Sequence, residues 1–181
     1  MTGFYLKLFL VNFTAMFAGA AGCYLFKLEP PAALLAALYP AGLFAVLITF
    51  AAGPFHAAAS KKIAGAACGA EIYRTRQSAE LSIGLDYNEL FSLVHRYLKE
   101  KAGFEIAEAD TRTRRITARS PITLKTFGNV IIIEFDNTDP ILTKLKILSR
   151  PRLSTTMLDY GENLKIVLDI RAYLLQNATH Q

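Results

Sequence analysis

Residues 32–55 read AALLAALYPAGLFAVLITFAAGPF, a run that contains no charged side chain. A second apolar run, residues 4–26, precedes it and carries a single charge, Lys7. A helix of roughly 20 apolar residues crosses the hydrocarbon core of a bilayer, and both runs are long enough. The intervening KLEPP (27–31) combines charges with two prolines, which cannot continue a helix. The sequence therefore predicts a hairpin of two transmembrane helices, at about 4–26 and 32–55.

A cleaved signal peptide is the alternative interpretation of the first run. A secretory signal has a basic leader, a short apolar stretch and a small-residue cleavage site, and AGAAG (18–22) is similar to such a site. However, Lys7 is the only early cation, the apolar run is too long, and a second span follows directly. We therefore favour a transmembrane hairpin that occupies residues 1–56.

Small residues recur four positions apart in both runs. They are Ala15/Gly19 and Ala18/Gly22 in the first run, and Ala33, Ala37, Ala41 and Ala45 in the second. Residues at this spacing share one helix face, and small side chains there let two backbones approach closely. Alanine is also simply common in membrane helices. We expect the ridges to pack the hairpin or to support a homo-oligomer.

Cations follow the second run along the chain. They are Lys61, Lys62, Arg74 and Arg76, against the single acid Glu71. Lys and Arg close to a membrane span are retained on the cytoplasmic side. The sequence therefore predicts that both termini are cytoplasmic, in an integral protein of the bacterial inner membrane.

The composition changes after Ser60. Residues 57–79 are rich in small and polar side chains and are predicted to form a juxtamembrane linker, followed by a cytoplasmic domain at 80–181. Alternating apolar residues predict strands near 81–85, 104–109, 115–120, 129–135 and 142–149. Helical spacing predicts one helix that starts at 86–89 and stops near Gly103, and another at about 160–176.

The order of these elements indicates the fold class. Consecutive strands joined by short turns are most easily antiparallel. We expect a transmembrane hairpin followed by an α+β domain, with one antiparallel sheet in the order β-α-β-β-β-β-α. Both helices should cover one face of that sheet.

The segment LDYGEN (158–163) has the composition of a reaction centre, but it also has the pattern of a helix start. Asp159 and Glu162 are three positions apart before an apolar helix, which is the spacing of a capping box. Asp86 and Glu89 repeat the pattern in DYNE (86–89). Carboxylates at these positions pair with free backbone N–H groups and favour the positive end of the helix dipole. We interpret all four acids as structural helix caps.

No pattern in the chain indicates catalysis, a metal site or a bound cofactor. The three histidines, His56, His95 and His180, lack metal-ligand spacing, and Cys23 and Cys68 form no CxxC pair. Phosphate-binding glycine motifs are also missing from the sequence. We therefore expect no catalytic residues and no cofactor.

Basic residues gather at the strand positions whose side chains should point away from the helices, and in the loops beside these strands. The candidates for anion or partner binding are Arg112, Arg114, Arg115, Arg119, Lys144, Lys146, Arg150 and Arg152. Strand alternation places four of them on one open sheet face with Val130 and Ile132. The alternative interpretation is an ordinary solvated face, since lysine is common on exposed strands.

The segments ITLKTFGNVIII (122–133) and SRPRLSTTMLDYGEN (149–163) resemble a group of bacterial domains of unknown function. That group has a Leu-Lys-Ser/Thr-aromatic-Gly segment before a strand and Asp-aromatic-Gly-x-Asn before the last helix. The resemblance covers roughly residues 80–181 and implies no activity. This chain carries Glu162 where the group has a cation. The order of strands and helices is also similar to one repeat of the TATA-binding-protein fold, which is a similarity of topology alone.

These observations favour a membrane-anchored, non-enzymatic binding or assembly module. Its expected partners are the membrane itself, anionic lipid head groups, or a protein. An enzyme that acts on a lipid or other anionic substrate is the alternative, with Arg150, Arg152 and the hydroxyls of 153–156 as its binding groups. Nucleic acid is not expected, because the net charge of +5 is modest and aromatic side chains do not alternate with basic ones on any strand.

Overall fold

The computed structural model describes residues 2–66, 69–123, 126–136 and 142–178, so the predictions for Cys68 and His180 lie outside the described residues. Two compact units make up the chain, Met1–Ala59 and Ser60–Gln181. The predicted domain of 80–181 therefore begins earlier than expected. Much of the predicted linker of 57–79 belongs to regular elements of the second unit.

Two helices form the first unit, and both are long and apolar enough to cross a membrane. Helix α1 spans Thr2–Leu25, and helix α2 spans Pro30–Ala64, with Pro40 and Pro54 inside it. The break at KLEPP is confirmed, but α2 continues well beyond the predicted end at residue 55. Its last residues, 60–64, belong to the second unit.

The alanine ridge of α2 is the buried face of the hairpin. Its four members, Ala33, Ala37, Ala41 and Ala45, have no exposed surface. The same face continues to Gly53, where a Cβ atom would lie only 2.7 Å from Cε1 of Tyr5 and 3.5 Å from Cδ2 of Leu8. The low ridge of one helix thus receives large side chains of the other, which permits a close approach.

The small-residue ridge of α1 does not pack the hairpin, and its predicted role in a homo-oligomer stays a prediction. Ala15, Ala18, Gly19 and Gly22 are exposed, and nothing lies within 4 Å of a Cβ placed on either glycine. The buried face of α1 carries the bulky Leu8, which is 1% exposed, together with the small Ala21. Two low ridges facing each other would leave empty space, so one ridge is filled by the larger side chains of the partner helix.

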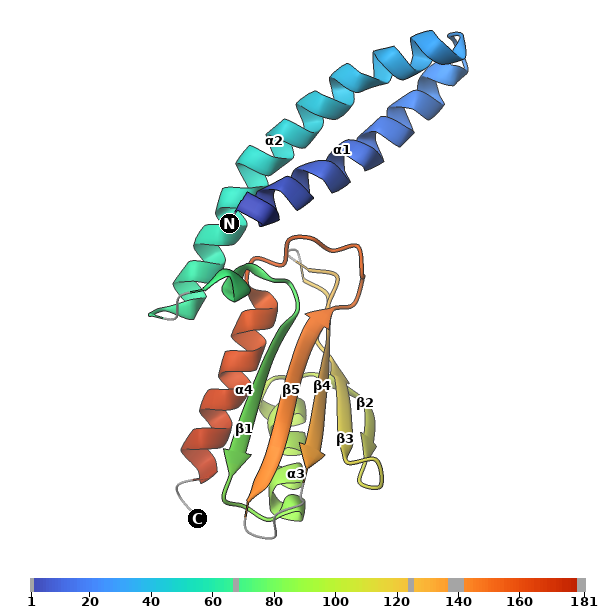
Figure 1. The fold of residues 1–181 in the computed structure, drawn as a ribbon. Helices are drawn as coiled ribbons and strands as arrows, with labels where there is room; N and C mark the ends of the chain where they lie inside the picture. Colours follow the sequence, from blue (N-terminus) through green and yellow to red (C-terminus); the bar gives the residue numbers. More distant parts are fainter. Residues whose placement is uncertain (1, 67–68, 124–125, 137–141, 179–181) are drawn as a thin grey trace. The chain divides into compact units, whose positions relative to one another are not determined.

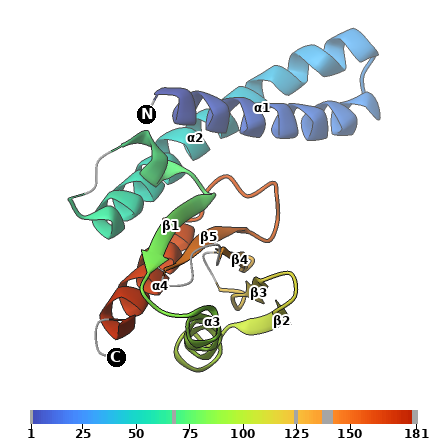
Figure 2. The ribbon, with the colours of Figure 1, turned by 60° about the horizontal axis from the view of Figure 1, so that its bottom comes forward.

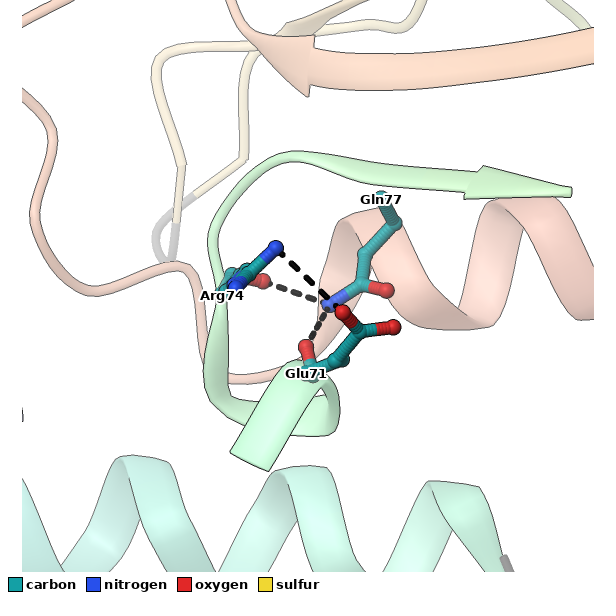
Figure 3. A network of polar contacts seen from close by, with 3 residues as sticks. All are labelled: Glu71, Arg74 and Gln77. Atoms are coloured by element: carbon teal, nitrogen blue, oxygen red, sulfur yellow. Dashed lines mark hydrogen bonds and ion pairs between the residues drawn. The ribbon is translucent and has the colours of Figure 1, made fainter. Parts of the chain in front are cut away.

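A short structured connection leads from α2 into the sheet. A 3₁₀ turn, η1 (Ala70–Tyr73), is held to the first residue of strand β1 by the side chain of Gln77. Its Nε2 donates to the backbone oxygens of Glu71 at 2.8 Å and Arg74 at 2.7 Å (Figure 3). Because Gln77 is buried, these bonds are protected from water and fix the entry into the sheet.

The second unit is an α+β domain with five antiparallel strands, as predicted (Figure 1). The strands are β1 (Gln77–Ile83), β2 (Glu105–Asp110), β3 (Arg115–Arg119), β4 (Asn129–Asp136) and β5 (Thr143–Pro151). Their order in the sheet is β1-β5-β4-β3-β2. The first strand therefore pairs with the last one, and the other three pairings join strands that are consecutive in the chain.

Both helices of this unit cover the same face of the sheet (Figure 2). Helix α3 spans Tyr87–Arg96 and continues as a π-helical turn, η2 (Tyr97–Lys101), and helix α4 spans Glu162–Ala178. The rings of Tyr97 and Tyr173 join the two helices at a centroid distance of 4.5 Å. Apolar residues at alternate strand positions, such as Ile116, Ile131 and Ile147, meet these helices with no exposed surface.

We expect Ala41→Leu to destabilise the hairpin, because the alanine is fully buried on the ridge of α2. Overpacking of this kind costs about 1–3 kcal/mol. Ala51→Leu is the matched control, since Ala51 lies on the exposed side of the same helix. Thermal unfolding in detergent should show a lower midpoint for the first variant alone. Equal midpoints would mean that the ridge does not pack the two helices.

Candidate functional site

The predicted basic residues separate into three groups in the structure. Five of them point from the sheet face that no helix covers, and these are Arg115, Arg119, Lys144, Lys146 and Arg150. Arg112 and Arg114 lie instead in the turn between β2 and β3, where Asp110 accepts a hydrogen bond of 2.8 Å from the backbone of Arg112. Arg152 follows β5 in an exposed loop.

Acidic residues that the sequence reading did not weigh stand opposite these cations. One row across the sheet reads Arg115, Glu134, Lys146, Glu80, and Lys146 forms an ion pair of 3.2 Å with Glu80. In the same way Asp136 is the register partner of Lys144, and Glu105 is that of Arg119. Opposite charges in register stabilise neighbouring strands. The face is therefore mixed in charge and not basic, which weakens the predicted attraction for anions.

An apolar strip crosses the same face beside the charged row. Ile132 pairs in register with Leu148, and Val130 is two residues away on the same strand. Ile132 is only 9% exposed, whereas Val130 and Leu148 are half-buried. The Nε atom of Arg115 is buried and has no hydrogen-bond partner among the described residues. The face thus combines an apolar strip with a charged border, a combination that is also found in protein–protein interfaces.

The two segments that carry the family resemblance converge at one end of the sheet. They contribute Asn129 at the start of β4, Ser149 near the end of β5, and Asp159 and Asn163 around the start of α4. All four side chains are at most 1% exposed. Leu124 and Lys125 of the first segment lie outside the described residues.

The side chain of Asn163 connects this polar cluster. Its Oδ1 accepts from Oγ of Ser149 at 2.6 Å, and its Nδ2 donates to Oδ1 of Asn129 at 3.1 Å and to Oδ2 of Asp159 at 2.8 Å. The Asp159 carboxylate also accepts from the backbone N–H groups of Gly161 and Asn163. Such a cluster is stable when buried because its polar atoms satisfy one another.

The predicted caps occupy the following places. Asp86 is the N-cap of α3, and it accepts from the backbone N–H groups of Asn88 at 2.6 Å and Glu89 at 3.0 Å. Asp159 serves the start of α4 in a similar way, but it is fully buried within the polar cluster. Glu162 is the first residue of α4, and its side chain lines a cavity. A carboxylate without exposed surface cannot reach a substrate, so the geometry of Asp159 is that of a structural group.

Gly161 has a further role that the sequence reading missed. Its φ of +77° follows the +52° of Tyr160, so two successive residues adopt the left-handed conformation before α4. A Cβ on Gly161 would lie 2.7 Å from Cδ1 of Ile63 and 3.1 Å from Cα of Ser60. The last turns of α2 therefore pack directly on the start of α4, at a separation that only glycine permits.

A cavity of about 300 Å³ adjoins the polar cluster on the helix side of the sheet. It lies between η2, the first turns of α4 and the segment after β3. Its polar wall includes Lys101, Ser120, Glu162, Lys165 and Asp169. Ser120 belongs to both features, because its Oγ accepts from the backbone N–H of Asn129 at 2.9 Å. Sequence reasoning missed this site because its residues come from distant segments.

Two ionisable side chains that line the cavity, Tyr97 and Lys165, have shifted pKa values. The Asp169 carboxylate, 2.7 Å from Nζ of Lys165, raises the pKa of that lysine. Burial, and then the charge of Asp169, raises the pKa of Tyr97. Both shifts move away from neutral pH, whereas a general base needs a pKa close to it. Among the described residues, there is also no group of three or more His, Cys, Asp or Glu that could hold a metal ion.

Comparison with known proteins adds no functional assignment. No family model matches the chain, and no curated protein matches it. A solution NMR structure of a structural genomics target from Thermobifida fusca is similar over 58% of this chain and 88% of that chain. The sequence identity is 9% and the TM-score is 0.39, values too low to support an argument about fold or function. The resemblance to the uncharacterised bacterial domains therefore stays a prediction.

Asn163→Ala should destabilise the second unit strongly, because it removes the bonds that the buried Oγ of Ser149 and Oδ1 of Asn129 make with the amide, and one of the bonds to Asp159. Each unsatisfied group costs about 1–3 kcal/mol. Asn177→Ala is the control, since that half-buried amide on the same helix has, among the described residues, the carbonyl of Tyr173 as its one acceptor. Chemical denaturation monitored by tyrosine fluorescence measures both. A loss no larger than that of the control would contradict a structural role for the cluster.

Gly161→Ala should cost more stability than Gly103→Ala. The two glycines have similar φ angles, +77° and +66°, but nothing lies within 4 Å of a Cβ on Gly103. The control therefore reports the left-handed conformation alone, at about 1–2 kcal/mol. Gly161→Ala should add about 1–3 kcal/mol from the collision with Ser60 and Ile63. Equal losses would show that the last turns of α2 do not pack closely on α4.

Proposed function

We propose that this protein is a membrane-anchored, non-enzymatic binding or assembly module whose α+β domain recognises a protein partner. The observation that supports it best is the open sheet face. An apolar strip of Val130, Ile132 and Leu148 lies there beside a row of alternating charges. Alternating charges select a partner with the complementary order and add little to non-specific anion binding.

The hairpin supports the anchoring part of the proposal. Large apolar side chains cover its outer surface, including Tyr39 and Phe50, which are 78% and 75% exposed. A surface of this kind is costly in water and favourable in lipid. The exposed Lys61 and Lys62 in the last turn of α2 favour a cytoplasmic location of both termini, in a bacterial inner membrane.

Recognition of anionic lipid head groups by the sheet face is a weaker form of the proposal. Each of Arg115, Arg119, Lys144 and Lys146 could contribute about 1 kcal/mol beside an anionic leaflet. The register partners Glu134, Glu105, Asp136 and Glu80 would oppose that attraction.

An enzyme acting on a lipid or other anionic substrate is the second candidate. The cavity of about 300 Å³ is the observation that favours it. However, neither Arg150 nor Arg152 lines this cavity, and the pKa shifts of Tyr97 and Lys165 do not prepare a base. We therefore keep the binding module as the conclusion.

The test combines mild detergent extraction of the full chain with identification of the proteins and lipids that co-purify. Lys146→Glu should abolish capture of the partner, because it places three acids side by side with Glu80 and Glu134. Lys99→Glu, the same charge change at an exposed position of η2, should leave capture intact. The thermal midpoint of each variant shows whether the fold is kept.

Three results would oppose the proposal. Capture that survives Lys146→Glu would remove the sheet face from recognition, and co-purification of lipid alone would favour the lipid or enzyme interpretation. Release of the full chain by alkaline carbonate would contradict the anchor.

Protease digestion of inside-out and right-side-out vesicles tests the orientation of the chain. Cleavage of the second unit only from the outside would contradict a cytoplasmic location of this unit.

A further inference from the structure

Three large apolar side chains are exposed in two loops of the second unit. Ile122 is 68% exposed and Phe127 is 63% exposed, both in the connection between β3 and β4, and Leu153 is 45% exposed just after β5. Solvated loops usually carry polar side chains, so three such residues in one place call for a covering partner.

The two loops are held together around Gly128. The backbone N–H of Arg152 donates to the carbonyl of Gly128 at 3.0 Å, which brings the neighbours Phe127 and Leu153 to the same place. Cγ1 of Ile122 lies 3.8 Å from the position of a Cβ on Gly128. Gly128 has a φ of +82°, and its Cβ would lie 2.9 Å from the carbonyl oxygen of Ser120, so the loops pack tightly there. These backbone contacts bring the two loops together, and we name the three exposed side chains that they carry the apolar tip (Ile122, Phe127 and Leu153).

The apolar tip lies at the end of the second unit where α4 begins (Figure 1). The last turns of α2 lie at this end too, because Ser60 and Ile63 pack on Gly161. Exposed cations accompany both features: Lys61 and Lys62 on α2, and Arg152 beside Leu153. Aromatic and aliphatic side chains with nearby Lys and Arg are typical of protein surfaces at the membrane–water interface.

We propose that the apolar tip inserts into the head-group region of the same bilayer that holds the hairpin. The inference rests on the proposed membrane anchoring and adds the lipid surface as the partner of this end of the domain. Its cations are suited to an anionic leaflet, because Arg152 and Lys61 form no ion pair with an acid among the described residues, whereas Lys146 on the sheet face is paired with Glu80. Only this end of the domain enters the lipid in this proposal, so the open sheet face stays accessible to a protein.

The experiment uses tryptophan as a local probe, since the chain contains none. Full-length Phe127→Trp is reconstituted in vesicles with an anionic lipid fraction and with lipids brominated close to the head group. We expect blue-shifted emission, loss of most of the fluorescence to the brominated lipid, and little quenching by aqueous iodide. Ile122→Trp gives a second reading of the same patch if the first variant folds poorly.

Two matched positions serve as controls. Thr111→Trp places the probe in the exposed turn at the opposite end of the sheet, and Ser82→Trp places it on the open face of β1. Both should be quenched by iodide and not by brominated lipid. If the tip probes behave like Thr111→Trp, the tip does not insert, and if Ser82→Trp alone is quenched by lipid, the sheet face lies on the membrane. Either result overturns the inference.

Carbonate extraction of the same samples separates this inference from the proposed function. If the chain stays in the vesicles but the tip probes remain in water, the anchor is supported and only the insertion of the apolar tip is contradicted. A chain that is released by carbonate lacks the anchor itself.

Discussion

The carboxamide of Asn163 joins three parts of the second unit that are far apart in the chain. Through Ser149, Asn129 and Asp159 it fixes the end of β5, the start of β4 and the start of α4. These side chains are buried, so water cannot replace a lost bond, and each group depends on the others. The cavity, the two loops of the apolar tip and the contact with α2 all lie around this cluster. Their positions therefore follow from one hydrogen-bonded network.

On the open sheet face, strand pairing places acidic side chains beside the cations, so the face is mixed in charge. Taken alone, Arg115, Lys144 and Lys146 suggest a basic surface. In the sheet, Glu134 lies between Arg115 and Lys146, and Asp136 lies beside Lys144. The field that such a face presents to a distant anion is small, because opposite charges on neighbouring strands cancel within a screening length. Close contact with a complementary surface is different, since each charge then meets its own partner.

Glycine positions give the second unit its close packing at the end where α4 begins. Gly128 lets the β3–β4 connection approach Ser120, and Gly161 lets the end of α2 approach α4. Both have positive φ angles, so a side chain would be strained there even with free space. The domain thus combines a tightly packed end, held by buried polar bonds and glycine contacts, with a sheet face that no helix covers.

Local periodicity was sufficient to predict most elements of the fold. The uncharged run 32–55, the alternation around Ile131 and Ile133, and the apolar stripe of 164–174 each have one structural solution, because burial demands a fixed repeat. The break at KLEPP and the N-cap at Asp86 follow from equally local chemistry. The extension of α2 to Ala64 was not predicted, because the polar residues after residue 55 ended the apolar pattern, and in the structure Ser60 and Ile63 of this extension lie against Gly161.

The candidate sites were decided by tertiary structure. The sequence placed Arg115, Arg119, Lys144 and Lys146 on one face, but only strand register set Glu80, Glu134 and Asp136 among them. It identified Asp159 as a helix cap, but Asn129 and Ser149 became its neighbours only when β4 and β5 paired. Sequence patterns report the environment of a residue along its own element. Partners from distant segments depend on register and packing, which many sequences of the same periodicity could satisfy in different ways.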